Sequence, residues 1–416
     1  MKKALLLILA IAMVFMFGVS CSKKAATTTA AAPAASTSAP AASATTTTQT
    51  KEAEVITIAF IGNTTGDYAM YGVPVRNSVA MFFEQLNAAG GINGKQVKLL
   101  EYDDKADGTE SINAYNLAKA NGATAIIGSV LSGASIALSD VTYDDNMPQI
   151  SASATNPKLT VMDPDDPKSE VKTNVFRTCF LDPFQGEKMA QYAAQVYGAK
   201  TIAIFYENGS DYSEAIVQGV ESQLEACGLK VVAKEAFATG DVDYKAQMTN
   251  VAAANPDVVL MPIYYGEAGR AITALRAAGC NAKIIGGDGF GSVVNYASAA
   301  DLEGTIYMSG YAPGTPSVAK FESDYKAKFN EDVPNMFAPL AWDAALVMTE
   351  GLKAAEAKGL KAGSAEYKQA VIDAIKNLQA FEGITGSYTF NATNDPIKSV
   401  AIIKIAGGAE VFDAFF

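Results

Sequence analysis

From residue 55 onward, short runs of apolar and β-branched residues alternate with longer amphipathic stretches. Residues 55–61, 96–102 and 123–128 are apolar runs bounded by turn-forming residues, as expected for buried strands. Residues 73–89 and 111–121 lie between these runs and place apolar residues at helical spacing. Strands that alternate with helices of this length predict a parallel sheet with helices on both faces.

The same order of elements begins again in the second half of the chain. This second series comprises residues 201–206, 212–226, 228–233, 257–262 and 282–287. Two series of this kind predict two α/β lobes built on one plan, each a mostly parallel sheet flanked by helices. Ligands of open α/β sheets bind at the carboxyl ends of the strands, so the loops of the two lobes are expected to face one cleft. Such a hinged pair could close over a small ligand.

The predicted cleft loops of the first lobe are rich in hydroxyl groups and glycine. They are residues 64–72, 129–135 and 151–156. Ser132 precedes a predicted helix, where hydroxyl and backbone N–H groups form a ready site for an anion. Ser153 and Thr155 add further hydroxyl groups. The alternative is that these residues are ordinary helix N-caps.

The predicted cleft loops of the second lobe offer tyrosines and one carboxylate, Asp288, between glycines. They are residues 207–212, 264–267 and 286–291. A wall of anion donors that faces a carboxylate suits a zwitterion, because each buried charge needs a charged or multiply hydrogen-bonded partner. An α-amino acid is such a ligand. The alternative for Asp288 is an ordinary turn residue.

The N-terminal 50 residues have the composition of an export signal and a tether. Residues 1–20 place two lysines before an apolar run and are expected to be a secretory signal peptide, with an uncleaved anchor helix as the alternative. The residues before Cys21 resemble a bacterial lipobox, although Gly18 stands where that pattern usually has leucine. Residues 21–50, with a lipidated Cys21 followed mainly by Ala, Thr, Ser and Pro, predict a disordered tether. We therefore expect an exported protein, either anchored by lipid to the outer face of the cytoplasmic membrane or periplasmic.

Composition excludes several classes of function. The chain has no histidine, which removes Ser-His-Asp and Cys-His catalysis and histidine-ligated zinc. It has 44 acidic and 32 basic residues, so no nucleic-acid partner is expected. Cys179, Cys227 and Cys280 have no metal-binding spacing, and we expect buried thiols with at most one disulfide among them. No cofactor and no metal are predicted.

Several short motifs in the body resemble the leucine/isoleucine/valine-binding proteins of bacterial ABC importers. They recur in order over nearly the whole chain after residue 55, and they comprise residues 65–72, 90–94, 102–104, 127–128, 139–140, 177–178, 182–186, 243–244, 256–258 and 276–279. The resemblance implies the type I periplasmic-binding fold, with two Rossmann-like lobes joined by a three-segment hinge. It implies that residues 55–181 and 311–388 form lobe 1, and that residues 182–310 and 389–416 form lobe 2.

The resemblance also implies roles for individual residues. Ser132 and Thr155 match residues that hold the ligand carboxylate, and Ser153 matches a residue whose backbone carbonyl receives the ammonium group. Asp288 stands where the leucine-type proteins have a glutamate that pairs with the ammonium group. The aromatic residues expected around the ligand are Tyr71, Tyr212 and Tyr264.

This chain departs from the family in its first lobe. The family disulfide is absent, because Ala106 and Leu131 stand at the matching positions. Leu131 is expected to enlarge the apolar lining of the cleft, together with Val130, Phe184 and Phe290. The alternative is that these residues pack in the core.

The resemblance implies an extracytoplasmic solute-binding lipoprotein, a monomer that delivers an amino acid with a branched-chain or other apolar side chain to ABC permease subunits. The lipid bilayer would be contacted through Cys21. A sensor of the same fold that feeds a signalling receptor is one alternative, and a binder of an amide, an aromatic acid or a short peptide is another. A carboxylate enzyme that uses Asp67 with Asp288 is a third, although no enzyme is expected.

Overall fold

A computed structural model describes residues 54–416 of the chain. The predicted signal peptide, Cys21 and the predicted tether lie outside these residues. None of the helices in residues 54–416 is long and apolar enough to cross a membrane.

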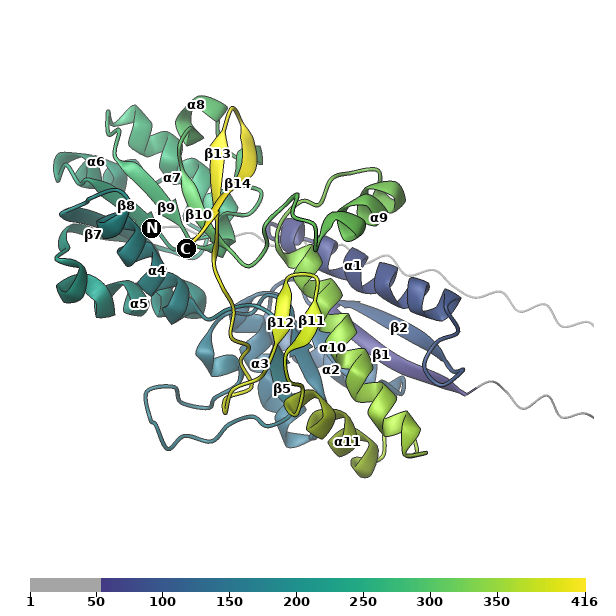
Figure 1. Cartoon of the computed structure of the whole chain (residues 1–416). Coiled ribbons are helices and arrows are strands. Elements are labelled where there is room, and N and C mark those ends of the chain that lie inside the picture. The colour runs from purple at the N-terminus through teal and green to yellow at the C-terminus, as the bar shows by residue number, and fades with distance from the viewer. Residues whose placement is uncertain (1–53) are drawn as a thin grey trace, which may run out of the picture. The chain divides into compact units, whose positions relative to one another are not determined.

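The first sheet has five parallel strands in the order β2-β1-β3-β4-β5 (Figure 1). The strands are β1 (Val55–Gly62), β2 (Gln96–Asp103), β3 (Ile126–Gly128), β4 (Gln149–Ser151) and β5 (Val175–Arg177). Its helices are α1 (Ala69–Ala88), α2 (Gly108–Ala120), α3 (Ser132–Asp144), α10 (Phe337–Ala357) and α11 (Ala365–Lys376). Helices α1 and α10 lie side by side although they are far apart in the sequence (Figure 1). A short hairpin of β11 (Phe381–Gly383) and β12 (Gly386–Tyr388) follows α11.

The second sheet has seven strands in the order β14-β13-β10-β9-β8-β6-β7 (Figure 1). Its parallel strands are β6 (Thr201–Asn208), β7 (Lys230–Ala238), β8 (Val258–Met261), β9 (Lys283–Gly286) and β10 (Ile306–Ser309). They repeat the strand order of the first sheet, as the sequence predicts. The chain ends in an antiparallel hairpin of β13 (Ala401–Ala406) and β14 (Ala409–Phe415), which the sequence analysis did not anticipate.

The remaining elements belong with the second sheet or with the connections between the sheets. The helices are α4 (Asp182–Gln195), α5 (Asp211–Cys227), α6 (Lys245–Ala253), α7 (Tyr265–Ala277), α8 (Ala299–Leu302) and α9 (Ala319–Phe329). Short 3₁₀ turns are η1 (Pro157–Leu159), η2 (Asp288–Phe290) and η3 (Val293–Asn295). Residues 178–181, 310–318 and 389–400 connect elements of one sheet with elements of the other. The predicted fold class is confirmed, and the exact lobe boundaries stay a prediction.

Local sequence signals explain where the flanking helices begin and end. Helix α5 begins after Ser210, whose hydroxyl accepts a hydrogen bond from the backbone N–H of Ser213 at 3.4 Å. It ends at Gly228, which takes a left-handed conformation with φ of 62°. Its acidic first turn, Asp211 and Glu214, complements the positive end of the helix dipole. Ordinary capping therefore fixes this helix.

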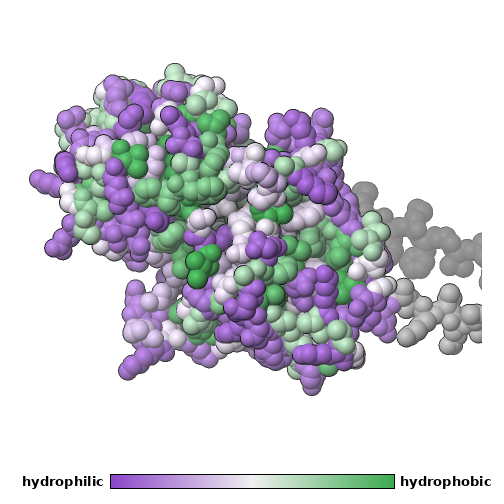
Figure 2. All heavy atoms as spheres, viewed as in Figure 1, coloured by the Kyte–Doolittle hydropathy of each residue, from purple (hydrophilic) through white to green (hydrophobic). Residues whose placement is uncertain are grey.

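In the view of Figure 2, hydrophilic residues cover most of the rim of the molecule, and apolar residues gather in patches between the hydrophilic ones. Large apolar residues that are exposed belong to separate elements; among them are Leu117, Val196, Val242, Ile397 and Phe415. Single exposed apolar residues on separate elements are normal for a protein surface.

Candidate functional site

A cavity lies between the loops that follow strands of both sheets. It has about 250 Å³ of empty space. Its lining residues come from both lobes and are Tyr71, Val130, Leu131, Ser132, Ser153, Thr155, Tyr212, Tyr264, Asp288, Gly289 and Phe337. The cavity therefore exists only when the two sheets' loops face each other.

One wall of the cavity consists of hydrogen-bond donors without partners. Helix α3 begins at Ser132, and its N-cap residue, Leu131, has no side chain that could accept from the first turn. The first N–H groups of a helix have no partner within it, so they remain available here. The hydroxyl of Thr155 is buried and has no hydrogen-bond partner in the described chain. This wall can receive an anion such as a carboxylate.

A buried arginine holds the loop that presents Thr155. The Arg177 guanidinium donates to the carbonyl of Ala154 at 2.8 Å and to that of Asn156 at 3.0 Å, which are the carbonyls on either side of Thr155. Arg177 is fully buried and pairs with Asp395 at 2.7 Å. The hydroxyl of Ser153 donates to the carbonyl of Val130 at 2.7 Å, which ties this loop to the start of α3. These bonds fix the position of the loop that presents Thr155.

The opposite wall presents one buried carboxylate. Asp288 is 1% exposed, and its Oδ1 accepts from the Tyr212 hydroxyl at 2.8 Å and from Nε2 of Gln185 at 3.0 Å. No lysine or arginine in residues 54–416 forms an ion pair with it. Burial raises the pKa of Asp288 to about 6, against the lowering effect of these hydrogen bonds. An uncompensated buried carboxylate is a site for a cation.

Aromatic rings fill the space between the two walls. Tyr212 and Tyr264 stack with their ring centroids 4.7 Å apart, and Tyr71 meets the edge of Phe337 at 5.1 Å. These rings offer an apolar surface to a ligand side chain.

Tyr71 also joins the two lobes. Its hydroxyl donates to the carbonyl of Gly289 and accepts from the backbone N–H of Tyr265 at 3.3 Å. The next residue, Gly72, lets α1 approach the end of β1, because a Cβ there would lie 1.9 Å from the carbonyl oxygen of Asn63. Direct hydrogen bonds therefore cross the cavity from the first-sheet side to the second-sheet side.

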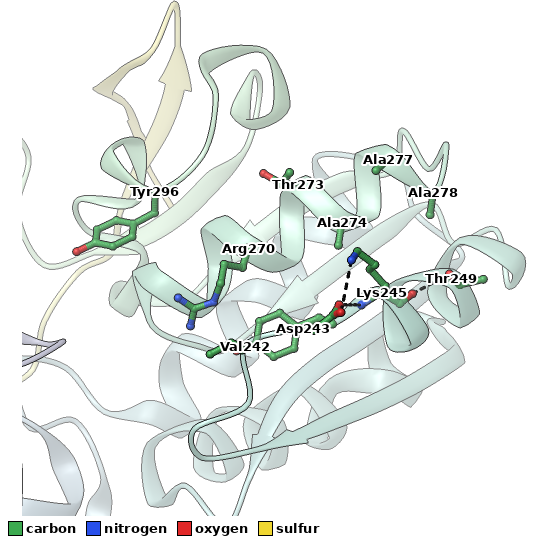
Figure 3. A pocket seen from close by; sticks show the side chains of 11 residues that line it. Val242, Asp243, Lys245, Thr249, Arg270, Thr273, Ala274, Ala277, Ala278 and Tyr296 are labelled. Atoms are coloured by element: carbon green, nitrogen blue, oxygen red, sulfur yellow. Dashed lines mark hydrogen bonds and ion pairs between the residues drawn. The ribbon is translucent and has the colours of Figure 1, made fainter.

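A larger hollow lies on the second lobe alone, beside α6 and α7 (Figure 3). It has about 1200 Å³ of space that is open to solvent. Its charged groups are paired within the lobe: Lys245 lies 3.5 Å from Asp243, and Arg270 lies 3.1 Å from Glu267. None of its lining residues comes from the first sheet, so lobe closure does not assemble it. The smaller cavity is the better candidate for the functional site.

Comparison with known proteins identifies the family. The protein-family model described as "Periplasmic binding protein" matches residues 55–409. A Leu/Ile/Val-binding protein of Rhizobium johnstonii is 31% identical over 342 residues, which cover 82% of this chain and 88% of that protein. The chain belongs to the Leu/Ile/Val-binding family of periplasmic binding proteins. A leucine-, isoleucine-, valine-, threonine- and alanine-binding protein of Pseudomonas aeruginosa is 30% identical, with 82% of this chain and 87% of that protein covered.

Solved structures of Leu/Ile/Val-binding proteins have the same fold. A leucine-binding protein of Thermotoga maritima is 27% identical, with a TM-score of 0.77 and coverage of 87% of this chain and 98% of that one. A branched-chain amino acid transporter substrate-binding protein of Streptococcus pneumoniae, solved with isoleucine, is 29% identical with a TM-score of 0.77. The match covers 86% of this chain and 99% of that one. The predicted resemblance is confirmed, and the chain is a solute-binding protein.

The cavity of the present chain brings together the predicted ligand residues except Phe184. Phe184 does not line it: its ring lies 6.3 Å from that of Phe180, and the Lys188 ammonium lies over it at 5.6 Å. Phe290 is fully buried and also lies outside the lining. Phe290 is packed in the core and Phe184 is partly buried against it, so a ligand contact of either residue stays a prediction. Leu131 and Val130 do line the cavity, at the place where the family disulfide is absent.

Two residues at the site were missed by the sequence analysis. Phe337 lines the cavity from the start of α10, and Gln185 supports Asp288 from the first turn of α4. Gln185 belongs to the 182–186 motif. That motif contributed to the family resemblance, but it assigned no role to Gln185. Phe337 gave no signal, because nothing in its local sequence places the start of α10 beside the first-lobe loops.

The structure also places the three cysteines and the two carboxylates of the enzyme alternative. Cys179, Cys227 and Cys280 are free thiols, and burial raises the pKa of Cys179. Asp67 is exposed and accepts from the Tyr265 hydroxyl through its backbone carbonyl, whereas Asp288 is buried. Asp67 does not line the cavity that Asp288 lines.

Proposed function

We propose that this chain is an extracytoplasmic solute-binding lipoprotein that captures an apolar α-amino acid between its lobes and delivers it to an ABC permease. The observation that supports the ligand class most is the buried, unpaired Asp288 across the cavity from the uncapped start of α3 and the unpartnered Thr155 hydroxyl. The two walls match the ammonium and carboxylate groups of one zwitterion. The site residues named above are the proposed ligand contacts.

The lining of the cavity favours a ligand with an apolar side chain. Val130, Leu131, Phe337 and the tyrosine rings would enclose an apolar side chain. Binding would stabilise the closed form relative to an open one, and the permease would recognise the closed form.

Calorimetric titration with each of the twenty amino acids tests this proposal. We expect binding of leucine, isoleucine or valine, and no binding of these amino acids after methylation of their carboxylate. Binding of none of the twenty would contradict the proposed ligand class. Equal binding of the methyl esters would contradict the proposed role of the donor wall.

The Thr155 hydroxyl is expected to contribute directly to affinity. Replacing Thr155 with valine keeps the shape of the side chain but removes the donor, so the affinity for L-isoleucine should fall by about tenfold. Thr249→Val is the matched control, because that hydroxyl donates to the Lys245 carbonyl at 2.7 Å on the exposed face of α6. Equal affinities for the parent and Thr155→Val would remove Thr155 from the site.

Ligand affinity is expected to fall in acid because Asp288 must be ionised to receive an ammonium group. Its pKa is about 6 in the empty site, so the affinity should fall by about tenfold per pH unit below pH 6 and stay level above it. Stability has the opposite sign: a raised pKa in the folded state means that the contribution of Asp288 to the free energy of unfolding falls as pH rises toward 6. Titrations between pH 4.5 and 8 measure the first effect, and a level profile would contradict it.

The lipid anchor and the monomeric state are part of the same proposal. The lipobox-like residues before Cys21 and the family's extracytoplasmic location support the anchor, and the scattered exposed apolar residues support a monomer. Replacing Cys21 with alanine is expected to move the protein from the membrane fraction to the soluble fraction. Fractionation of cells that express the full chain measures this. A Cys21→Ala protein that stays lipidated, or a parent that is soluble, would contradict the anchor.

A further inference from the structure

A second buried carboxyl group, Asp182, lies behind the ligand cavity. Asp182 is fully buried at the start of α4, and its backbone N–H donates to the carbonyl of Thr155 at 3.0 Å. It does not line the cavity and so does not contact the proposed ligand directly. Its position nonetheless places it next to Thr155 on the carboxylate-binding wall.

Gln185 links this second carboxyl group to Asp288. The backbone N–H of Asp288 donates to Oε1 of Gln185 at 2.9 Å, which fixes the orientation of the amide. Nε2 of Gln185 then donates to Oδ1 of Asp182 at 2.9 Å and to Oδ1 of Asp288 at 3.0 Å. The two hydrogens of one amide group are thus shared between two acids: Asp288, which lines the cavity, and Asp182, which lies behind the wall that carries Thr155.

Two buried polar atoms remain without partners at this point. They are Oδ2 of Asp182 and Oγ1 of Thr155, neither of which has a hydrogen bond within the described chain. The Thr155 hydroxyl is near enough to Asp182 to lower the pKa of its carboxyl. A buried polar atom without a partner costs about 1–3 kcal/mol, so one hydrogen is expected between these two neighbouring oxygens, supplied either by the Thr155 hydroxyl or by a protonated Asp182.

The surroundings of Asp182 favour its neutral form. The Asp288 carboxylate faces it across Gln185, and the Arg177 guanidinium, the one cation nearby, is already paired with Asp395. The other titratable groups around the two acids are the Cys179 thiol and the hydroxyls of Tyr71, Tyr212 and Tyr264, which are neutral near pH 7. Burial and the charge of Asp288 raise the pKa of Asp182 well above its ordinary value.

We propose that Asp182 is a positioning residue, held as a neutral acid whose Oδ2–H donates to Oγ1 of Thr155. The hydroxyl hydrogen of Thr155 then has no acceptor except the ligand carboxylate, so Thr155 is fixed as a donor to the ligand. Through Gln185, the same acid also fixes the Asp288 side chain that receives the ammonium group. The two walls of the zwitterion site share one chain of hydrogen bonds. This inference rests on the proposed function for the identity of the ligand.

Two substitutions of Asp182 test whether this residue is a neutral hydrogen-bond donor, an ionised acid, or a core residue without a role in binding. Asp182→Asn keeps a donor toward Thr155 and an acceptor for Gln185, so the affinity for L-isoleucine should stay within about threefold of the parent and its pH profile should keep the same midpoint. Asp182→Leu removes both functions and should weaken binding by about tenfold or more. Loss of affinity in Asp182→Asn equal to that in Asp182→Leu would overturn the neutral acid. Parent affinity in Asp182→Leu would overturn the positioning role.

Infrared spectroscopy of the ligand-free protein tests the protonation state without any ligand. At pH 7.5 we expect a C=O stretching band of a protonated carboxylic acid that disappears in Asp182→Asn and persists in Asp288→Asn. A spectrum in which no such band depends on Asp182 would overturn the proposal. A protein that has this band but binds no amino acid would instead contradict the proposed function, so the two failures are distinguishable.

Discussion

Replacing Asp288 with asparagine is expected to weaken the binding of L-isoleucine by about 100- to 5000-fold. Asp288 is buried, has no cation partner in the described chain, and is the one carboxylate that lines the cavity. Asparagine keeps the shape and an acceptor oxygen but leaves the ligand ammonium group buried without a charged partner. Breaking a buried ion pair from one side costs about 3–5 kcal/mol. That cost corresponds to the expected fold-change.

Asp243→Asn is the matched control for this substitution. Asp243 lies on the same lobe, pairs with Lys245 at 3.5 Å, and has a side chain that is 65% exposed. Its replacement should leave the affinity for L-isoleucine unchanged. Calorimetry on both variants, with thermal unfolding to check that each is folded, measures the difference. An Asp288→Asn protein with the affinity of the parent would show that the ammonium group is bound elsewhere.

Replacing Arg177 with methionine is expected to lower the free energy of unfolding by about 3–5 kcal/mol, because it leaves a buried carboxylate without its partner. Asp395, only 6% of whose side chain is exposed, would lose the ion pair at 2.7 Å. The carbonyls of Ala154 and Asn156 would also lose their donor. The loop that carries Thr155 should loosen, so ligand affinity should fall together with stability.

Urea unfolding of the ligand-free protein measures this loss. Lys320→Met is the control, since it removes a surface cation that pairs with Asp324 at 2.6 Å and is itself 82% exposed. Surface pairs of this kind contribute about 0–1 kcal/mol, so the midpoint of the control should hardly move. An unfolding midpoint of Arg177→Met equal to that of the control would contradict the anchoring role of Arg177.

The fold could be predicted from the sequence because its central strands are buried on both faces. Such strands are continuous apolar runs, and β1, β3, β6 and β8 are runs of this kind, followed by amphipathic helices. The β13–β14 hairpin could not be predicted in the same way. Strand β14 has only partly buried and exposed residues, and it joins the sheet through β13, whose pairing with β10 brings together distant segments of the chain.

Site residues that directly follow a strand could be predicted from the sequence. Site residues on helices were harder to predict, because their position depends on how the helices pack. Ser132, Thr155 and Asp288 follow strands β3, β4 and β9, so the topology alone places them at one edge of each sheet. Phe184 lies on a helix, and the sequence did not reveal which face of α4 meets the cavity. Phe337 reaches the cavity only because α10 packs beside α1.

The crystal structure of the protein with L-isoleucine tests the central claim most directly. We predict that the ligand carboxylate contacts Thr155 and the start of α3 at Ser132, that the ammonium group contacts Asp288, and that the side chain contacts Leu131 and Phe337. A ligand bound in the reversed orientation, or in the hollow beside α6 and α7, would contradict it.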